Sequence, residues 1–266
     1  MSVREARRVR HELKFRTLSV VSVEALTPTL KRIVLGGDDL DGFFSAGFDD
    51  HVKIFPVRDG EAAVLPTLGP DGPVFPEPRP IARDYTPRAY DAATNRLTID
   101  FVIGHGGPAT EWAEAATVGS VLGVGGPRGS FVVPTDYADH VLIGDETALP
   151  AIARRLEELP AGVRVLTLVE VEDAASRLAF TTRANLTQVW VERTGARGKA
   201  DALVEAVSAA AAGVSRDDAY VWIAAESQVA KALRLAMIGL GFDSKAMKAA
   251  GYWRLGDVGA HDVIGD

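Results

Sequence analysis

Cysteine is absent from this sequence of 266 residues. Its absence excludes disulfide bonds, cysteine nucleophiles and iron–sulfur clusters held by cysteine. It also fits a cytoplasmic protein, which is the location that we expect. The five histidines show neither a paired spacing nor an acidic cluster around them, so the sequence predicts no metal site.

Long apolar runs are absent as well. No stretch approaches 18 uncharged apolar residues, so we expect no membrane span, and the first eight residues contain no apolar signal core. The formal net charge of −7 argues against general binding of nucleic acid. Six basic residues near the start are a local exception, which we interpret as a frayed, solvated terminus: Arg4, Arg7, Arg8, Arg10, Lys14 and Arg16.

The first half of the chain has the pattern of an antiparallel barrel. Alternating or apolar segments between turn residues predict strands at 18–23, 30–35, 51–56, 97–103 and 121–124. Residues 57–82 hold six prolines and indicate a long loop with room for a small hairpin. With one short helix after residue 107, this pattern predicts a six-stranded antiparallel β-barrel.

After Pro134 the pattern changes to strands that alternate with helices. Apolar strands are expected at 140–144, 163–171, 188–192 and 219–225, and helices at 151–159, 200–212 and 227–239. Such alternation predicts a parallel sheet with helices on both faces. We therefore expect a two-domain β and α/β protein: a basic N-terminal arm at 1–15, a β-barrel at 16–135, and an α/β domain with a C-terminal tail at 136–266.

The stretch Arg83-Asp84-Tyr85-Thr86 lies between the proline-rich loop and the strand at 97–103. In an extended segment, Arg83 and Tyr85 point to one face and Thr86 to the other. A cation, an aromatic ring and a hydroxyl so placed can bind a flat, phosphorylated ligand. Taken alone, however, the stretch favours an ordinary barrel strand with a half-buried tyrosine.

A second candidate site follows the strand at 97–103. Two glycines lead into a short helix that has Pro108 in its first turn. Free backbone N–H groups at this helix start, with Thr110 beside them, make an anion site. The alternative is an ordinary strand-to-helix turn. Together with the change of pattern after Pro134, this turn favours a ligand site at Arg83–Thr86 over a plain strand.

A barrel followed by an α/β domain, with Arg-x-Tyr-Thr at 83–86 and Gly-x-x-Thr at 107–110, resembles the ferredoxin–NADP reductase superfamily. Five further segments, in this order, are similar to the siderophore-interacting proteins: 51–53, 100–102, 107–113, 145–151 and 251–254. The resemblance runs from about residue 15 to 256. It implies a cytoplasmic, FAD-containing ferric-siderophore reductase with a ferredoxin reductase-like fold.

The resemblance also implies roles for individual residues. Arg83 would pair with the FAD pyrophosphate, Tyr85 would stack on the isoalloxazine, and Thr86 would bond near its reactive edge. Thr147 would face the flavin, and Glu146 beside it has an alternative role as an acid in the first turn of a helix. The full expected cofactor set is Arg83, Asp84, Tyr85, Thr86, Asp100, Phe101, Val102, His105, Gly107, Pro108, Ala109, Thr110, Asp145, Glu146 and Thr147. No side chain is expected to act as acid, base or nucleophile, because the flavin carries the chemistry.

The electron donor stays open at this stage. The turn at 144–150 lacks the Gly-x-Gly-x-x-Gly fingerprint, and no obvious arginine pair marks a 2′-phosphate site. NADPH and NADH therefore both remain candidates, with ferredoxin as a further alternative. The expected acceptor is an anionic ferric siderophore, attracted by Lys53, Arg128 and Arg254. Arg128 could instead serve the FAD phosphates, and Arg254 could be a structural cap.

Two other functions remain open. One is a general NAD(P)H:flavin reductase or diaphorase, and the other is a siderophore-binding protein without redox turnover. Turnover of several ferric chelates would identify the first, and a protein that stays colourless after FAD is offered would favour the second. We expect a monomer in every case.

Overall fold

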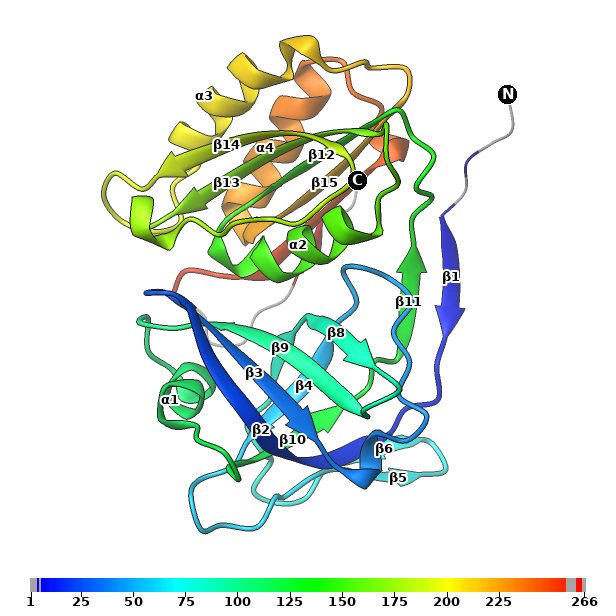
Figure 1. Ribbon diagram of the computed structural model, residues 1–266, viewed down its shortest axis with the longest axis vertical. Helices are drawn as coiled ribbons and strands as arrows, with labels where there is room; N and C mark the ends of the chain where they lie inside the picture. Colours follow the sequence, from blue (N-terminus) through cyan, green and yellow to red (C-terminus); the bar gives the residue numbers. More distant parts are fainter. Residues whose placement is uncertain (1–3, 5, 257–261, 265–266) are drawn as a thin grey trace. The chain divides into compact units, whose positions relative to one another are not determined.

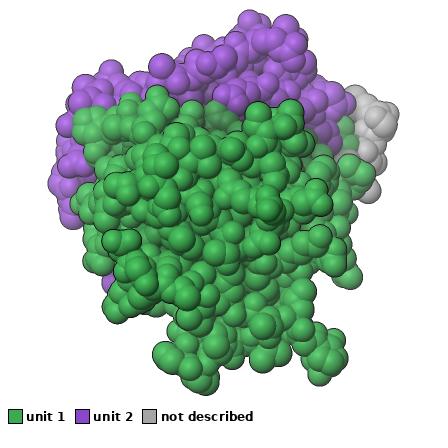
Figure 2. Space-filling view, turned by 60° about the horizontal axis from the view of Figure 1, so that its bottom comes forward, with its two compact units in different colours: residues 1–133 green, residues 134–266 purple. Residues whose placement is uncertain are grey.

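The computed structural model describes residue 4, residues 6–256 and residues 262–264. The chain divides into two compact units, residues 1–133 (unit 1) and residues 134–266 (unit 2), which are coloured separately in Figure 2. The expected domain boundary lay between residues 135 and 136. Within the described part of the chain, no helix is long and apolar enough to cross a membrane.

Unit 1 is built on a seven-stranded antiparallel sheet (Figure 1). In spatial order its strands are β7 (Arg83–Tyr85), β4 (Val52–Pro56), β10 (Val121–Gly125), β2 (Phe15–Thr27), β3 (Leu30–Gly36), β9 (Arg96–Val102) and β8 (Pro87–Asp91). The two edge strands, β7 and β8, are consecutive in the chain and are separated only by Thr86. The sheet must therefore curl until its edges approach, which makes a nearly closed barrel.

The fold class is confirmed, with one more strand than expected. The sequence predicts that Arg83, Tyr85 and Thr86 lie where one strand ends or the next begins. In the structure β7 pairs with β4, whereas β8 pairs with β9 at the opposite edge of the sheet. The chain changes partner at Thr86-Pro87, so two short strands stand there.

The barrel core consists of the inward residues of these strands, including Leu18, Ile33, Ile54 and Leu97, which are all fully buried. Burial alternates along the first half of β2 and along the start of β9, as expected for strands with one face in the core, whereas β9 is buried on both faces from Ile99 to Val102. The helix α1 (Pro108–Ala115) adds Trp112 and Ala113 to the same core. Its N-terminus is thereby fixed at the end of β9.

The interpretation of the N-terminal arm as a frayed terminus is wrong. Residues 7–10 form β1 (Arg7–Arg10), which pairs antiparallel with β11 (Gly129–Val132). The edge of β11 offers the backbone partners that an isolated basic segment lacks. The proline-rich loop does contain the small hairpin that was expected, formed by β5 (Thr67–Gly69) and β6 (Gly72–Val74). A short 3-10 turn, η1 (Asp38–Leu40), follows β3.

Unit 2 is the expected α/β layer structure. Its sheet runs in the order β14 (Asn185–Glu192), β13 (Arg164–Val171), β12 (Asp139–Gly144), β15 (Ala219–Glu226), β16 (Met247–Trp253) and β17 (Asp262–Ile264). The first five strands are parallel, and β17 is antiparallel to β16. The central strands β12 and β15 are buried along their whole length, which explains why they lack alternation.

Helices cover both faces of this sheet (Figure 1). The helix α2 (Leu149–Glu158) lies on one face, and α3 (Asp201–Ala210) and α4 (Ser227–Gly239) lie together on the other. Short 3-10 turns join the elements: η2 (Glu146–Ala148), η3 (Ala174–Ser176), η4 (Ala211–Gly213) and η5 (Ser244–Ala246). The turn after β12 thus lies at the carboxyl edge of a parallel sheet, where open α/β folds bind their ligands.

Candidate functional site

Tyr85 is held in place by a stack of aromatic rings in unit 1. Its ring lies 4.5 Å from that of Phe101, centroid to centroid, and Phe101 lies 5.6 Å from Trp112. Phe101 is fully buried, whereas Tyr85 is half-buried at the boundary of the core. Burial raises the pKa of the Tyr85 phenol well above its ordinary value, against the opposing effect of Arg83, so the ring stays neutral at physiological pH.

Arg83 precedes this ring on the same strand. The register places Arg83 opposite Ile54 and Tyr85 opposite Val52, so the two side chains share one face, as expected. The guanidinium donates one hydrogen bond, from Nη1 to the Ala82 carbonyl at 2.7 Å. No carboxylate of the described residues forms an ion pair with it. Most of the Arg83 donors are therefore available to an anionic ligand.

Asp84 and Lys53 occupy the opposite face of the β7–β4 pair. Lys53 Nζ lies 2.8 Å from Asp84 Oδ1, and the lysine side chain is 50% exposed. Thr86, which follows β7 directly, is buried. The structure thus brings the four residues of the motif and Lys53 together at one end of the barrel.

A glycine-rich turn connects β9 to α1. Gly104, Gly106 and Gly107 all have positive φ, and a β-carbon added at any of them would meet no atom within 4 Å. These glycines are therefore required by the backbone conformation and not by crowding, and the space beside them is open. No side chain caps α1, so the N–H groups of Ala109 and Thr110 remain for another acceptor, while the Glu111 N–H donates to the Gly107 carbonyl at 2.9 Å. The hydroxyl of Thr110 lies 3.3 Å from the ring nitrogens of His105.

These features fit a phosphate-bearing flavin. The half-buried Tyr85 ring offers a flat surface, and Arg83 offers a cation with available donors. Thr86 adds a hydroxyl, and the uncapped start of α1 adds backbone donors for an anion. Arg83, Tyr85, Thr86 and the turn before Pro108 would hold the group, and all of them belong to unit 1.

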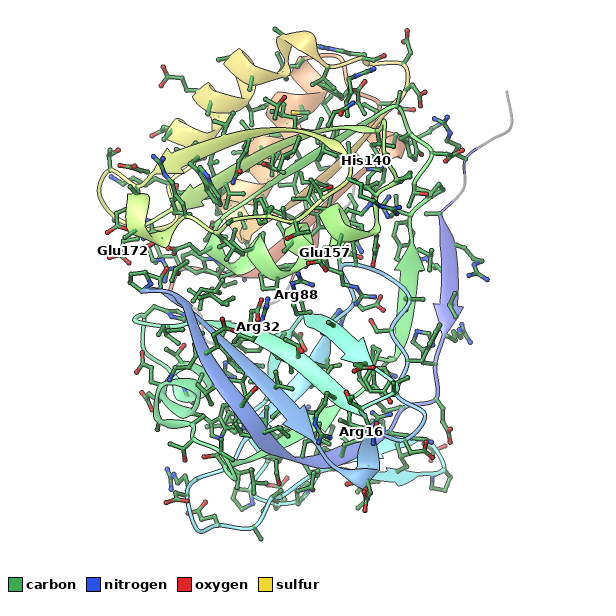
Figure 3. The ribbon with its side chains drawn as sticks, in the orientation of Figure 1. Arg16, Arg32, Arg88, His140, Glu157 and Glu172 are labelled. Atoms are coloured by element: carbon green, nitrogen blue, oxygen red, sulfur yellow. The ribbon has the colours of Figure 1, made fainter. Side chains whose placement is uncertain are left out.

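Other expected cofactor residues lie on β9, where Ile99 and Phe101 face the barrel core and the Asp100 side chain between them lies on the other face of the strand. The Asp100 carboxylate receives two hydrogen bonds from Arg32, at 2.7 and 2.8 Å, and Arg88 Nε lies 3.9 Å away. Figure 3 labels both arginines. Phe101 and Val102 are buried in the core. A ligand beside this strand would therefore meet its backbone and the two arginines before the Asp100 carboxylate.

In unit 2, Asp145 organises the turn after β12. Its Oδ1 accepts hydrogen bonds from the backbone N and the hydroxyl of Thr147, at 2.9 and 2.5 Å. Its Oδ2 accepts from Trp253 Nε1 at 2.8 Å and from the Glu226 amide at 3.2 Å. Asp145 therefore joins three parallel strands at their carboxyl ends, and Thr147 is oriented by it.

Glu146 lies at the same edge and is almost fully buried. Its Oε2 pairs with Arg193 at 2.9 Å and with Arg197 at 2.7 Å. Arg193 also donates to Glu170 at 3.0 Å. Burial raises the pKa of Glu170 despite the Arg193 partner. Burial lowers the pKa of Arg193, but its hydrogen bonds to Glu146 and Glu170 outweigh that effect and the pKa is raised.

Sequence reasoning missed this pair of arginines. Arg193 and Arg197 lie four residues apart in a loop, 47 and 51 positions from Glu146. Both cations form ion pairs with the buried carboxylate of Glu146. The local signal that could have found them is the cluster of basic residues after β14, which includes Lys199.

The three expected substrate cations fall in different units. Lys53 and Arg128 belong to unit 1, where the Gly126–Pro127 peptide is cis and Arg128 is exposed just before β11. Arg254 belongs to unit 2, where it directly follows β16. Among the described residues, no group of three or more histidine, aspartate or glutamate side chains could hold a metal ion.

Two family models match the chain, and together they cover both units. Residues 19–131 match the siderophore-interacting FAD-binding domain, and residues 137–256 match the siderophore-interacting protein model. Neither match includes the strand β1.

The chain is similar to proteins of known name over almost its whole length. It is 40% identical to the NADPH-dependent ferric-chelate reductase of Escherichia coli over 94% of this chain and 97% of that protein. It is 38% identical to a siderophore utilization protein from T. fusca, with a TM-score of 0.88 over 96% and 98% of the two chains. A ferredoxin reductase of carbazole 1,9a-dioxygenase, at 19% identity and a TM-score of 0.63 over 89% of this chain and 69% of that one, shares the fold. The chain belongs to the siderophore-interacting protein family.

Proposed function

We propose that this chain is an FAD-dependent ferric-siderophore reductase that passes electrons from NADPH to Fe(III) in its chelate and releases Fe(II). The observation that carries the proposal is the pairing of Arg83 and Tyr85 with an uncapped, glycine-led helix start in unit 1. Membership of the siderophore-interacting protein family supports it, as does the relative named as an NADPH-dependent ferric-chelate reductase.

When bound, FAD supplies the ability to accept a hydride and to give up single electrons, which ferric iron requires. The residues of the chain bind the flavin and orient it. Arg83 would pair with the pyrophosphate, Tyr85 would stack on the isoalloxazine, and the Thr86 hydroxyl would bond near the flavin edge. The N–H groups at the start of α1 bind phosphate oxygens. No side chain moves a proton, so the rate of electron transfer depends on how the chain positions the flavin and the substrate.

The substrate residues that we propose are Lys53, Arg128 and Arg254. Lys53 is paired with Asp84 at 2.8 Å, so an anionic chelate competes with that carboxylate for the ammonium. Half of the lysine side chain is exposed, so the exchange needs no unfolding of the strand. Fe(II) binds hard oxygen ligands more weakly than Fe(III), so reduction releases the metal.

We further propose that residues 16–135 form the FAD domain and residues 136–266 the nicotinamide domain. The carboxyl edge of the unit 2 sheet, at Asp145–Thr147, is the place for the donor nucleotide. Ferredoxin is the alternative donor. The protein would act as a monomer in the cytoplasm, where reduced nicotinamide nucleotides are available.

Anaerobic reduction of the FAD-loaded protein tests this function. NADPH, NADH and reduced ferredoxin are offered separately, and bleaching of the flavin absorbance is followed. We expect the fastest bleaching with NADPH. A protein that takes up no flavin, or whose flavin no donor reduces, would overturn the proposal.

A further inference from the structure

A small open hollow lies in unit 1 beside the N-terminal arm. Its volume is about 250 Å³, and all of its lining residues belong to unit 1. Cationic side chains outnumber the single acidic one in the lining, which consists of Arg10, His11, Glu12, Lys14, Arg16, Gly42, Phe44, Gly126 and Pro127. The lining therefore carries more positive than negative formal charge, although the chain has a net charge of −7 and the Asp39 carboxylate lies near Arg16.

The rim of the hollow carries two cations that a ligand can reach. Arg10 is exposed at the end of β1, and no carboxylate of the described residues pairs with it. Lys14 has a single ion pair, with Glu12 at 3.7 Å, and that glutamate side chain is 78% exposed. A surface pair of this length contributes little to stability, so Lys14 can exchange Glu12 for a ligand anion.

The floor and wall are rigid. Arg16 is buried and donates to the backbone carbonyls of Asp39 at 3.0 Å and Gly126 at 2.8 Å (Figure 3). His11 Nε2 lies 2.6 Å from Ser130 Oγ, which donates to Asp50 at 2.5 Å. These bonds fix the arm to the body of the barrel, so its cations are positioned before any ligand arrives.

An aromatic edge completes the hollow. Phe44 is 57% exposed, and the His11 ring meets it edge-on at 5.2 Å. An exposed aromatic ring next to cations suits a ligand that is both flat and anionic. A catecholate arm of an iron chelate has both properties.

The hollow is linked through the sheet to Lys53, one of the residues already proposed for the substrate. Phe15 on β2 pairs with Gly125 on β10, which pairs with Lys53 on β4, which pairs with Asp84 on β7. These four residues lie on four neighbouring strands, so the distance from Phe15 to Asp84 across the sheet is about 14 Å. The Gly126 amide donates to the Lys14 carbonyl at 2.9 Å, so the turn that carries Arg128 is tied directly to the lining of the hollow.

We propose that Arg10 and Lys14, above the buried Arg16, form an additional anion subsite for a peripheral catecholate or carboxylate group of the ferric chelate. The inference rests on the proposed function and extends its substrate site onto the N-terminal arm. The hollow is smaller than a site for a whole drug-sized ligand, so it takes one arm of the chelate. Its concave form suits a small molecule and not the flat face of an acidic protein.

Binding of a redox-inert chelate tests the subsite separately from electron transfer. The FAD-loaded protein is titrated with a gallium(III) tricatecholate, which is anionic, and with a gallium(III) trihydroxamate whose metal core is neutral. Arg10→Glu/Lys14→Glu is compared with Arg7→Glu/Arg8→Glu, which reverses two charges on β1 outside the hollow. We expect the first variant to lose about tenfold or more in tricatecholate affinity and less than about twofold in trihydroxamate affinity. The control variant should lose less than about twofold with either chelate.

Three results would overturn the subsite. They are an equal loss in the control variant, an equal loss with the trihydroxamate, and a wild-type protein that does not bind the gallium tricatecholate. A wild-type protein that binds this chelate at Arg10 and Lys14 but reduces no ferric siderophore would instead overturn the proposed function alone.

Discussion

Arg83 is the residue that we propose as the main anchor of the cofactor. It is half-buried, and the structure gives it one backbone acceptor and no ion pair among the described residues. Arg83→Ala should lose FAD, because charge-assisted hydrogen bonds of about 1.5–3 kcal/mol each to phosphate would disappear. The exposed Arg58, which lies 4.0 Å from Glu61, is a matched control. Flavin that stays stoichiometric with Arg83→Ala through gel filtration would contradict the assignment.

Tyr85 gives a pH-dependent prediction. Burial raises the pKa of its phenol, so above pH of about 10 the unfolded chain loses a proton that the native state retains. Native stability must therefore fall as the pH rises through that value, by at most about 1.4 kcal/mol per pH unit for this group. Tyr85→Phe should remove that part of the decline. Urea unfolding at pH 8 and pH 11 measures it, and an identical pH dependence in both proteins would refute the prediction.

At the scale of elements, the turn before α1 allows a matched test of the proposed phosphate site. Gly107 has φ +97° and open space beside it, and Gly119 has φ +92° with open space in a turn that we assign no ligand. Alanine at either position should cost roughly 1 kcal/mol through backbone strain alone. Only Gly107→Ala should also weaken FAD binding, because it moves the N–H groups at the helix start. Equal FAD affinity in the two variants, measured by flavin fluorescence, would argue against a phosphate site here.

The pairing of β3 with β9 is reinforced by a buried ion pair. The Asp100 side chain is fully buried, and Arg32 on the facing strand supplies both of its short hydrogen bonds. Arg32→Gln should lower the free energy of unfolding by about 3 kcal/mol, because it removes one partner of a buried charge. Arg177→Gln, which breaks an exposed pair with Glu192, should cost less than about 1 kcal/mol. Thermal unfolding measures both variants. If the Arg32→Gln and Arg177→Gln proteins had similar midpoints, Arg88 alone would be sufficient to stabilise the Asp100 charge.

The elements that could be predicted from the sequence are those with a local pattern. Alternation in β2 and β9 and the unbroken apolar runs of β12 and β15 arise from burial on one or both faces. Partners distant in the chain leave no such pattern. The pairing of β1 with β11, about 120 positions along the chain, was missed, and so was the separation of β7 from β8 at Thr86.

The features of the candidate site also divide into those with a local sequence pattern and those without one. The sequence placed Arg83 and Tyr85 on one strand face and the glycines before α1 at a helix start, because both features are local. It did not show that Asp84 pairs with Lys53, that Asp100 pairs with Arg32, or that two arginines bind Glu146. Each of those contacts joins residues at least 31 positions apart.

At the scale of the whole molecule, charge sets a constraint on the substrate. The chain carries a net charge of −7, which disfavours the approach of an anionic chelate. Local cations oppose this effect: Lys53 pairs with Gly125, and Arg10 pairs with Gly129, the residue after Arg128. The interaction acts over about one Debye length, roughly 8 Å at physiological ionic strength, so only cations close to the chelate contribute.

Electron transfer from reduced flavin to a ferric siderophore tests the central claim most directly. The FAD-loaded protein is reduced anaerobically with one equivalent of NADPH and mixed with a ferric tricatecholate in the presence of a ferrous-specific chromophoric chelator. We expect the flavin absorbance to return while two equivalents of Fe(II) complex form, and we expect no return with the gallium(III) chelate. Flavin that stays reduced in the presence of the ferric chelate would contradict the account.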